Sequence, residues 1–273
     1  MNIEKKVNII MFVIFILTLI IYYIFYSILM KNDYFYLWYI NNKILFYFLN
    51  YIFIIIFLII IERKIFKNLY KKYIDILNNA LEPEKFIKLT EIELKKSKRP
   101  LYKNYLKMNL IAGYSALNKI DTAAQLLEEI DLKNKKRIKA DLKLLYYYNK
   151  SLFSYILNKE DEAKKVYENT LEILNGNKNK LIDEMKIRFD ILKYLIYDED
   201  NIDEIIKLYE KIIKISKEKI TIIFAKYNIA EYKEKKGNTE EALRLYKEVA
   251  ETGNRLYITE KSKEKIEKLC KKN

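Results

Sequence analysis

The chain has 273 residues, and 51 Lys and Arg against 37 Asp and Glu give it a formal net charge of +14. It contains no His, 1 Cys, 4 Gly and 2 Pro. These counts exclude a disulfide within the chain, a zinc site made of Cys and His, and Ser-His or Cys-His catalysis, and they leave little glycine for tight β-turns. The composition therefore predicts an all-α protein.

Residues 8–30 or so are predicted to form a first transmembrane helix. No charged residue occurs from Val7 to Met30, and a helix of that length rises roughly 36 Å against a hydrocarbon core of about 30 Å. A cleaved signal peptide is the alternative. It is disfavoured because the apolar stretch is about twice the usual length and because bulky residues such as Tyr22 and Tyr26 stand where a small-x-small cleavage site is needed.

Residues 44–61 are predicted to form a second transmembrane helix. The stretch has no charged residue and rises about 27 Å as a helix, close to the lower limit for a span. A buried core helix is the alternative. The run from Ile54 to Ile61 is apolar on every helical face, which suits lipid better than a one-sided core. Residues 1–61 are thus predicted to form a membrane anchor.

The link between the spans, Lys31 to Lys43, is rich in aromatic residues, which favour the headgroup layer. It is predicted to be a short loop at the membrane surface. Orientation follows from the basic residues, because positive charge resists translocation. The link has two, the amino end adds Lys5 and Lys6, and five follow the second span: Arg63, Lys64, Lys67, Lys71 and Lys72. We expect a multi-pass protein of the cell membrane with both termini in the cytoplasm.

Residues 62–99 are predicted to form a basic juxtamembrane segment and an irregular helical hairpin. The apolar residues from Ile65 to Leu77 recur with a helical period, and Pro83 and Pro100 are suited to the first turn of two further helices. The five basic residues after the second span set the topology, and they are also placed to contact anionic headgroups.

A repeat occupies residues 100–273. Its anchors are Ala123, Ala163, Ile205 and Ala242, at steps of 40, 42 and 37 residues, and each follows a polar, turn-like stretch. Three and four residues beyond each anchor lie further apolar or aromatic side chains: Leu126, Leu127, Val166, Tyr167, Leu208, Tyr209, Leu245 and Tyr246. A helical pattern precedes each turn, at Leu101 to Leu117, Ile138 to Leu157, Leu181 to Tyr197 and Ile220 to Lys235. The unit is two helices joined by a turn, and such units must stack to bury their apolar faces.

The stretch Tyr227-Asn228-Ile229-Ala230, followed by Gly237-Asn238-Thr239-Glu240-Glu241-Ala242, resembles a tetratricopeptide (TPR) repeat. In that family a small residue on the first helix packs against the alanine that opens the second. Ala230 with Ala242, and Ser151 with Ala163, match this pair. The steps exceed the family's usual period of about 34 residues, and the trailing proline is absent. The resemblance implies a TPR-like α-α superhelical solenoid, closed by a capping helix at Leu256 to Leu269.

Asn109, Asn149 and Asn228 each stand 14 residues before an anchor. The resemblance implies that this position faces a concave groove, where an amide can donate to and accept from a peptide backbone. A solvated or local role is the alternative. Tyr147 and Tyr148 add aromatic surface next to Asn149, and at least one residue of the run from Tyr146 is expected in the core.

These features predict a membrane-anchored scaffold or adaptor that binds a protein or peptide partner at the cytoplasmic face. Two alternatives stay open, a sensor of a short signalling peptide and a noncatalytic subunit of a membrane transport or secretion assembly. We expect no enzymatic activity, cofactor or metal. We also expect no nucleic acid, because the Lys residues are interspersed with Glu and no recognition motif accompanies them.

Overall fold

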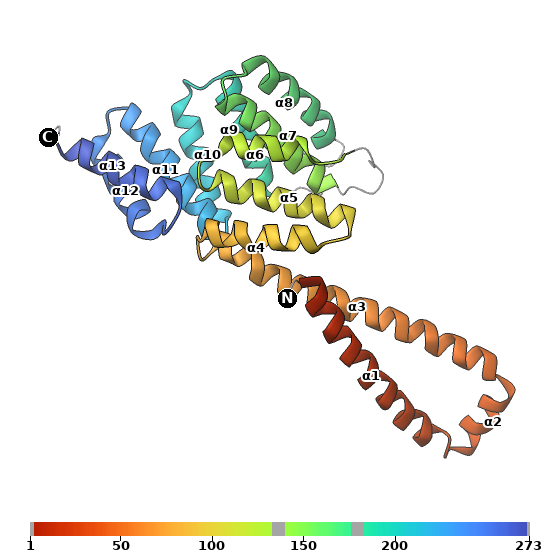
Figure 1. The fold of residues 1–273 in the computed structure, drawn as a ribbon. Helices are drawn as coiled ribbons and strands as arrows, with labels where there is room; N and C mark the ends of the chain where they lie inside the picture. The colour runs from red at the N-terminus through yellow and green to blue at the C-terminus, as the bar shows by residue number, and fades with distance from the viewer. Residues whose placement is uncertain (1–2, 133–139, 176–182, 272–273) are drawn as a thin grey trace. The chain divides into compact units, whose positions relative to one another are not determined.

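The computed structural model describes residues 3–132, 140–175 and 183–271. Over these residues the chain forms helices α1 to α13 and no β-strand, which confirms the all-α prediction (Figure 1). The chain divides into two compact units, residues 1–73 and 74–273. The first contains α1 (Ile3–Leu29), α2 (Asp33–Asn41) and most of α3 (Lys43–Asn78).

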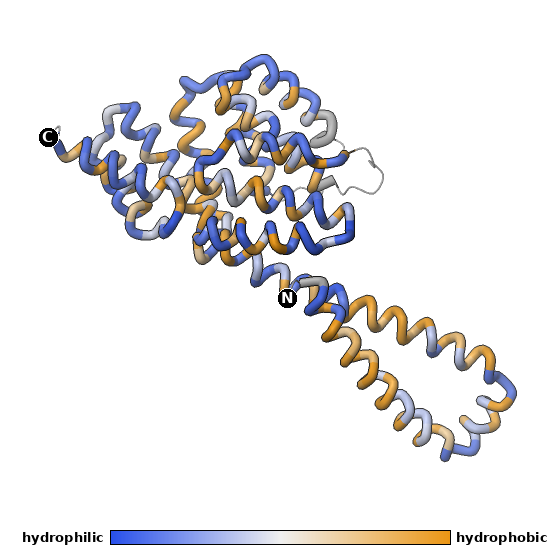
Figure 2. Tube along the Cα trace, in the orientation of Figure 1, coloured by the Kyte–Doolittle hydropathy of each residue, from blue (hydrophilic) through white to orange (hydrophobic). Residues whose placement is uncertain are grey.

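Helices α1 and α3 are long and apolar enough to cross a membrane. Apolar residues predominate along most of α1 and the first part of α3 (Figure 2). Almost none of this surface is buried inside the protein. A core helix of a soluble domain would bury it, so the exposure disfavours the core-helix alternative for residues 44–61.

The link between the spans is a helix rather than the predicted loop. Asn32 caps α2, because its side chain accepts a hydrogen bond from the backbone N–H of Phe35 at 3.0 Å, and Asp33 lies in the first turn. Rings from all three helices then pack together. Tyr39 of α2 lies 5.7 Å from Tyr26 of α1 and 5.4 Å from Phe46 of α3, between ring centroids. This cluster joins the end of α1 and the start of α3 to the linking helix.

The second span and the helical stripe after it form one element. The sequence analysis places residues 44–61 and the stripe from Ile65 to Leu77 in separate segments, but α3 runs without a break to Asn78. No proline or glycine interrupts it, so the helix continues from the apolar run into the basic one.

Residues 74–273 hold α4 to α13. Pro83 and Pro100 open α4 (Pro83–Lys96) and α5 (Pro100–Ser115), as predicted. The remaining helices are α6 (Ile120–Glu128), α7 (Ala140–Ile156), α8 (Glu160–Asn175), α9 (Asp183–Tyr197), α10 (Ile202–Ile215), α11 (Lys219–Lys235), α12 (Thr239–Thr252) and α13 (Tyr257–Cys270). The pairs α5/α6, α7/α8, α9/α10 and α11/α12 are the four predicted helix pairs, although the predicted starts at Ile138 and Leu181 lie outside the described residues.

Three of the four predicted turns use a left-handed residue. Asn118 and Asn158 have φ of 58° and Gly237 has φ of 78°. These residue types tolerate that conformation best, and it reverses the chain at the end of a helix. The fourth turn differs, because Asp200, the residue five positions before Ile205, does not have a positive φ.

All four anchors are fully buried: Ala123, Ala163, Ile205 and Ala242 are each 0% exposed. Ala230, the small residue opposite Ala242, is also 0% exposed. In the second pair the Ser151 hydroxyl donates to the backbone carbonyl of Ala163 at 2.9 Å. Small residues thus bring the two helices of a pair close together where the pattern places them.

Three apolar clusters among the described residues each join one helix pair to the next. One contains Met108, Leu127 and Leu142 from α5, α6 and α7. A second contains residues of α7, α8 and α9, and a third contains residues of α9, α10 and α11. The tyrosines four residues after the anchors contribute here, since Tyr167 packs on Tyr197 at 5.9 Å and Tyr209 on Tyr232 at 6.5 Å. The arrangement is repeat-like, because a pair completes its core with the first helix of its neighbour.

Contacts far apart in sequence join the beginning of this unit to its end. The side-chain amide of Asn254 donates to the Ala80 carbonyl at 2.7 Å, and the Asn78 amide donates to Glu218 at 2.7 Å. The backbone N–H of Tyr257 donates to the Ala116 carbonyl at 3.2 Å. The turn after α3 is therefore held by the loops before α11 and α13.

Candidate functional site

The three predicted asparagines lie on α5, α7 and α11, the first helices of their pairs, and all are half-buried. The Asn228 amide donates to the Phe224 carbonyl of its own helix at 2.8 Å, which is the local role considered as the alternative. Its carbonyl oxygen stays available as an acceptor. For Asn149 the structure gives no side-chain hydrogen bond to a described residue. Asn149 is therefore the best placed of the three to bind a partner.

The neighbouring tyrosines pack mainly into the apolar clusters between the helices. Tyr146 is buried, as expected for one residue of the run, and Tyr147 packs against the same cluster with its ring edge-on to Tyr146 at 5.1 Å. Tyr148 packs edge-on to Phe189 at 5.3 Å, and burial raises its pKa. Both Tyr147 and Tyr148 remain half-buried, so only part of each ring is left to contact a partner.

A polar network that the sequence did not indicate lies beside Tyr148. Arg188 of α9 donates to Glu184 at 2.9 Å and to the Thr221 hydroxyl of α11 at 2.9 Å. Burial, and then the nearby Glu184 charge, raise the pKa of Glu218, while Arg188 opposes this. The Asn78 amide donates to the same carboxylate. One network thus links α9, α11 and the end of α3.

Two ion pairs recur at the same place in the repeat. Lys107 lies 3.1 Å from Glu129, and Lys226 lies 2.7 Å from Glu248. Each lysine stands 16 residues before its anchor and each glutamate six residues after it. That shared spacing is the signal that would have revealed the pairs. They hold the second helix of a pair to the first, near the surface, where such a bridge adds up to about 1 kcal/mol.

The five basic residues after the second span, Arg63, Lys64, Lys67, Lys71 and Lys72, lie on α3 and are exposed. Among the described residues the structure gives none of them an ion pair. Their charges are therefore left to solvent or to a ligand.

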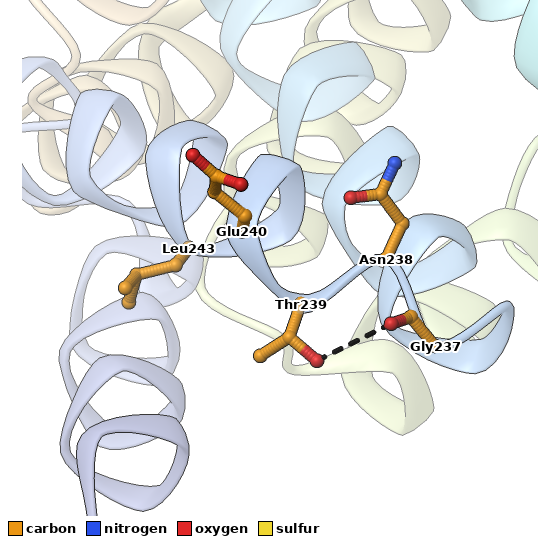
Figure 3. Close-up of a pocket in the computed structure, with 5 residues that line it drawn as sticks. All are labelled: Gly237, Asn238, Thr239, Glu240 and Leu243. Carbon is orange, nitrogen blue, oxygen red and sulfur yellow. Dashed lines mark hydrogen bonds between the residues drawn. The ribbon is translucent and has the colours of Figure 1, made fainter. Parts of the chain in front are cut away.

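An open hollow of about 560 Å³ lies at the turn between α11 and α12 (Figure 3). Gly237, Asn238, Thr239, Glu240 and Leu243 line it, and the Thr239 hydroxyl donates to the Gly237 carbonyl at 3.4 Å. None of the predicted partner-binding residues lines this hollow.

The chain was compared with models of known protein families, with curated proteins and with solved structures, and none of the three comparisons gives a match.

Proposed function

We propose that this chain is a membrane-anchored scaffold that binds a protein or peptide partner at the cytoplasmic membrane face. Helices α1 and α3 anchor it in the cell membrane with both termini in the cytoplasm. The helix pairs of residues 100–273 stack as a TPR-like superhelical solenoid that presents the partner surface and catalyses no reaction. The observation that carries the proposal is the combination of two exposed apolar helices with four helix pairs built on fully buried anchors.

The half-buried asparagines support a binding role for the first helices. A half-buried amide next to aromatic rings offers a donor and an acceptor in partly desolvated surroundings, where a hydrogen bond to a partner's backbone adds about 1 kcal/mol. Asn149, beside Tyr147 and Tyr148, has this setting.

The single cysteine, Cys270, tests the orientation, because it is free and exposed at the end of α13. In intact cells a membrane-impermeant thiol reagent should not label it, and labelling should appear once the membrane is permeabilised. A Cys270→Ser protein carrying Asn42→Cys at the opposite end of the spans should be labelled in intact cells. Labelling of Cys270 from outside would overturn the proposed topology.

Crosslinking of the full chain in its membrane, followed by purification, tests the partner. A scaffold should yield one stable protein partner. Co-purifying membrane subunits would favour an assembly subunit, and little protein would favour a peptide sensor. Asn149→Ala should weaken capture about fivefold, or about 1 kcal/mol, while Asn68→Ala on the exposed surface of α3 should leave it unchanged. Equal capture by both variants would reject a role for Asn149.

A further inference from the structure

The segment directly after the second span has an unbalanced charge. Residues 63–74 contain five basic residues and no acidic one, and Glu62 and Asp75 flank them. In residues 74–273 some lysines have carboxylate partners, as in the pairs of Lys107 and Lys226. The five exposed cations of this segment have no ion pair among the described residues. An anionic ligand would supply the missing charge.

The continuity of α3 aligns three of these cations along one side of the helix. Arg63, Lys67 and Lys71 are spaced by four residues, so they form a stripe, and Lys64 lies beside it. Phe66 and Tyr70, whose rings stack at 6.0 Å, lie along one edge of this stripe, because Tyr70 is seven residues after Arg63. Arg63, Lys67 and Lys71 are nevertheless exposed, so the neighbouring rings do not cover the stripe.

The cations also differ in their distance along the helix axis from the apolar run. Counted from Ile61, the last residue of the apolar run, Arg63 and Lys64 lie about 3–5 Å and Lys67 about 9 Å further along the axis. The headgroup layer is about 5–8 Å thick on each side of the hydrocarbon core. Long basic side chains can reach back toward that layer, so these three are within reach of phosphate oxygens. Lys71 and Lys72 start about 15 Å away, beyond the layer.

We propose that Arg63, Lys64 and Lys67 form a binding surface for anionic phospholipid headgroups. The guanidinium of Arg63 can donate two parallel hydrogen bonds to a phosphate, and the two lysines add point charges along the same stripe. An acidic protein segment has matching charge, but it would have to enter the headgroup layer to meet all three. The surface is independent of the partner surface on the first helices of the repeat.

The test uses the full-length protein in a non-ionic detergent, with phosphatidylcholine and phosphatidylglycerol added in equal amounts. Native mass spectrometry then measures how much of each lipid remains bound. The wild-type protein should retain phosphatidylglycerol in preference. Lys64→Gln with Lys67→Gln should weaken that retention about 30-fold, which is about 2 kcal/mol. Lys64→Arg with Lys67→Arg should keep it.

The matched control is Lys71→Gln with Lys72→Gln, which removes the same charge from the same helix. It should change retention by less than about threefold, because these residues stand beyond the headgroup layer. Circular dichroism checks that all variants keep their helices. Equal retention of the two lipids by the wild-type protein would overturn the proposal and leave an acidic protein as the ligand. Equal losses in the two Gln pairs would overturn it as well, because net charge alone would then explain the binding.

Discussion

Substitutions of Leu81, in the turn between α3 and α4, should follow an unusual order of stability. Leu81 is fully buried, at 0% exposed, and has φ of 57°, in the left-handed region. Leu81→Ala removes buried methyl groups and should cost about 2–5 kcal/mol. Leucine and alanine both pay about 1–2 kcal/mol for a left-handed backbone, and glycine does not.

Leu81→Gly should therefore be more stable than Leu81→Ala by about 0.5–1 kcal/mol, after the extra entropy that glycine loses on folding is subtracted. Leu127 is the matched control, because it is 1% exposed but lies inside helix α6. There the order should reverse, with Leu127→Gly less stable than Leu127→Ala by about 1 kcal/mol.

Urea titration of the full-length protein in detergent, followed by far-ultraviolet circular dichroism, measures these differences as shifts in midpoint at constant slope. The reasoning would be refuted if glycine were the less stable variant at both positions, since residue 81 would then have no left-handed strain to relieve. A cost below about 1 kcal/mol for Leu81→Ala would show that this side chain is not buried.

Four further outcomes are expected. Gly237→Ala should lower stability by about 1–2 kcal/mol in thermal unfolding, because alanine is strained at φ of 78°. The added methyl group has no neighbour within 4 Å, so the cost comes from the backbone alone. An unchanged melting temperature would contradict the left-handed turn. Ala242→Leu should overpack α11 against α12 and cost about 1–3 kcal/mol, because Ala242 is fully buried. Ala112→Leu, at an exposed site, should change stability by less than about 0.5 kcal/mol. Equal urea midpoints for these two variants would count against the pairing of α11 with α12. Burial and the charge of Glu184 raise the pKa of Glu218, so ionisation of this carboxyl opposes folding. Glu218→Gln should therefore stabilise the protein at neutral pH. This gain should vanish below the ordinary glutamate pKa of about 4.3. The hydrogen bond from Lys226 lowers the pKa of Glu248, so Glu248→Gln should destabilise at neutral pH and the loss should fade as the pH falls through the folded pKa. Effects of the same sign in the two variants would refute this electrostatic assignment.

The binding surface shows where sequence reasoning reaches its limit. The position of Asn149 on a first helix follows from its spacing to Ala163, and the structure places it half-buried there. The bond of Asn228 to its own helix does not follow, because Asn can serve either the backbone or a ligand. The Arg188 network was also missed, since its partner Thr221 lies 33 residues away on another helix.

Local physical chemistry let the sequence alone determine much of this protein. The length of an uncharged run predicts a span, proline predicts a first turn, and small residues at a repeated spacing predict the anchors Ala123, Ala163 and Ala242, all of which the structure buries. Only the tertiary structure decided that α2 is a helix, that α3 runs on to Asn78, and that Asn254 closes on Ala80 across 174 residues. A contact such as that of Asn254 with Ala80 depends on which helix surfaces pack together. The residue pattern within a single helix does not specify its distant partner.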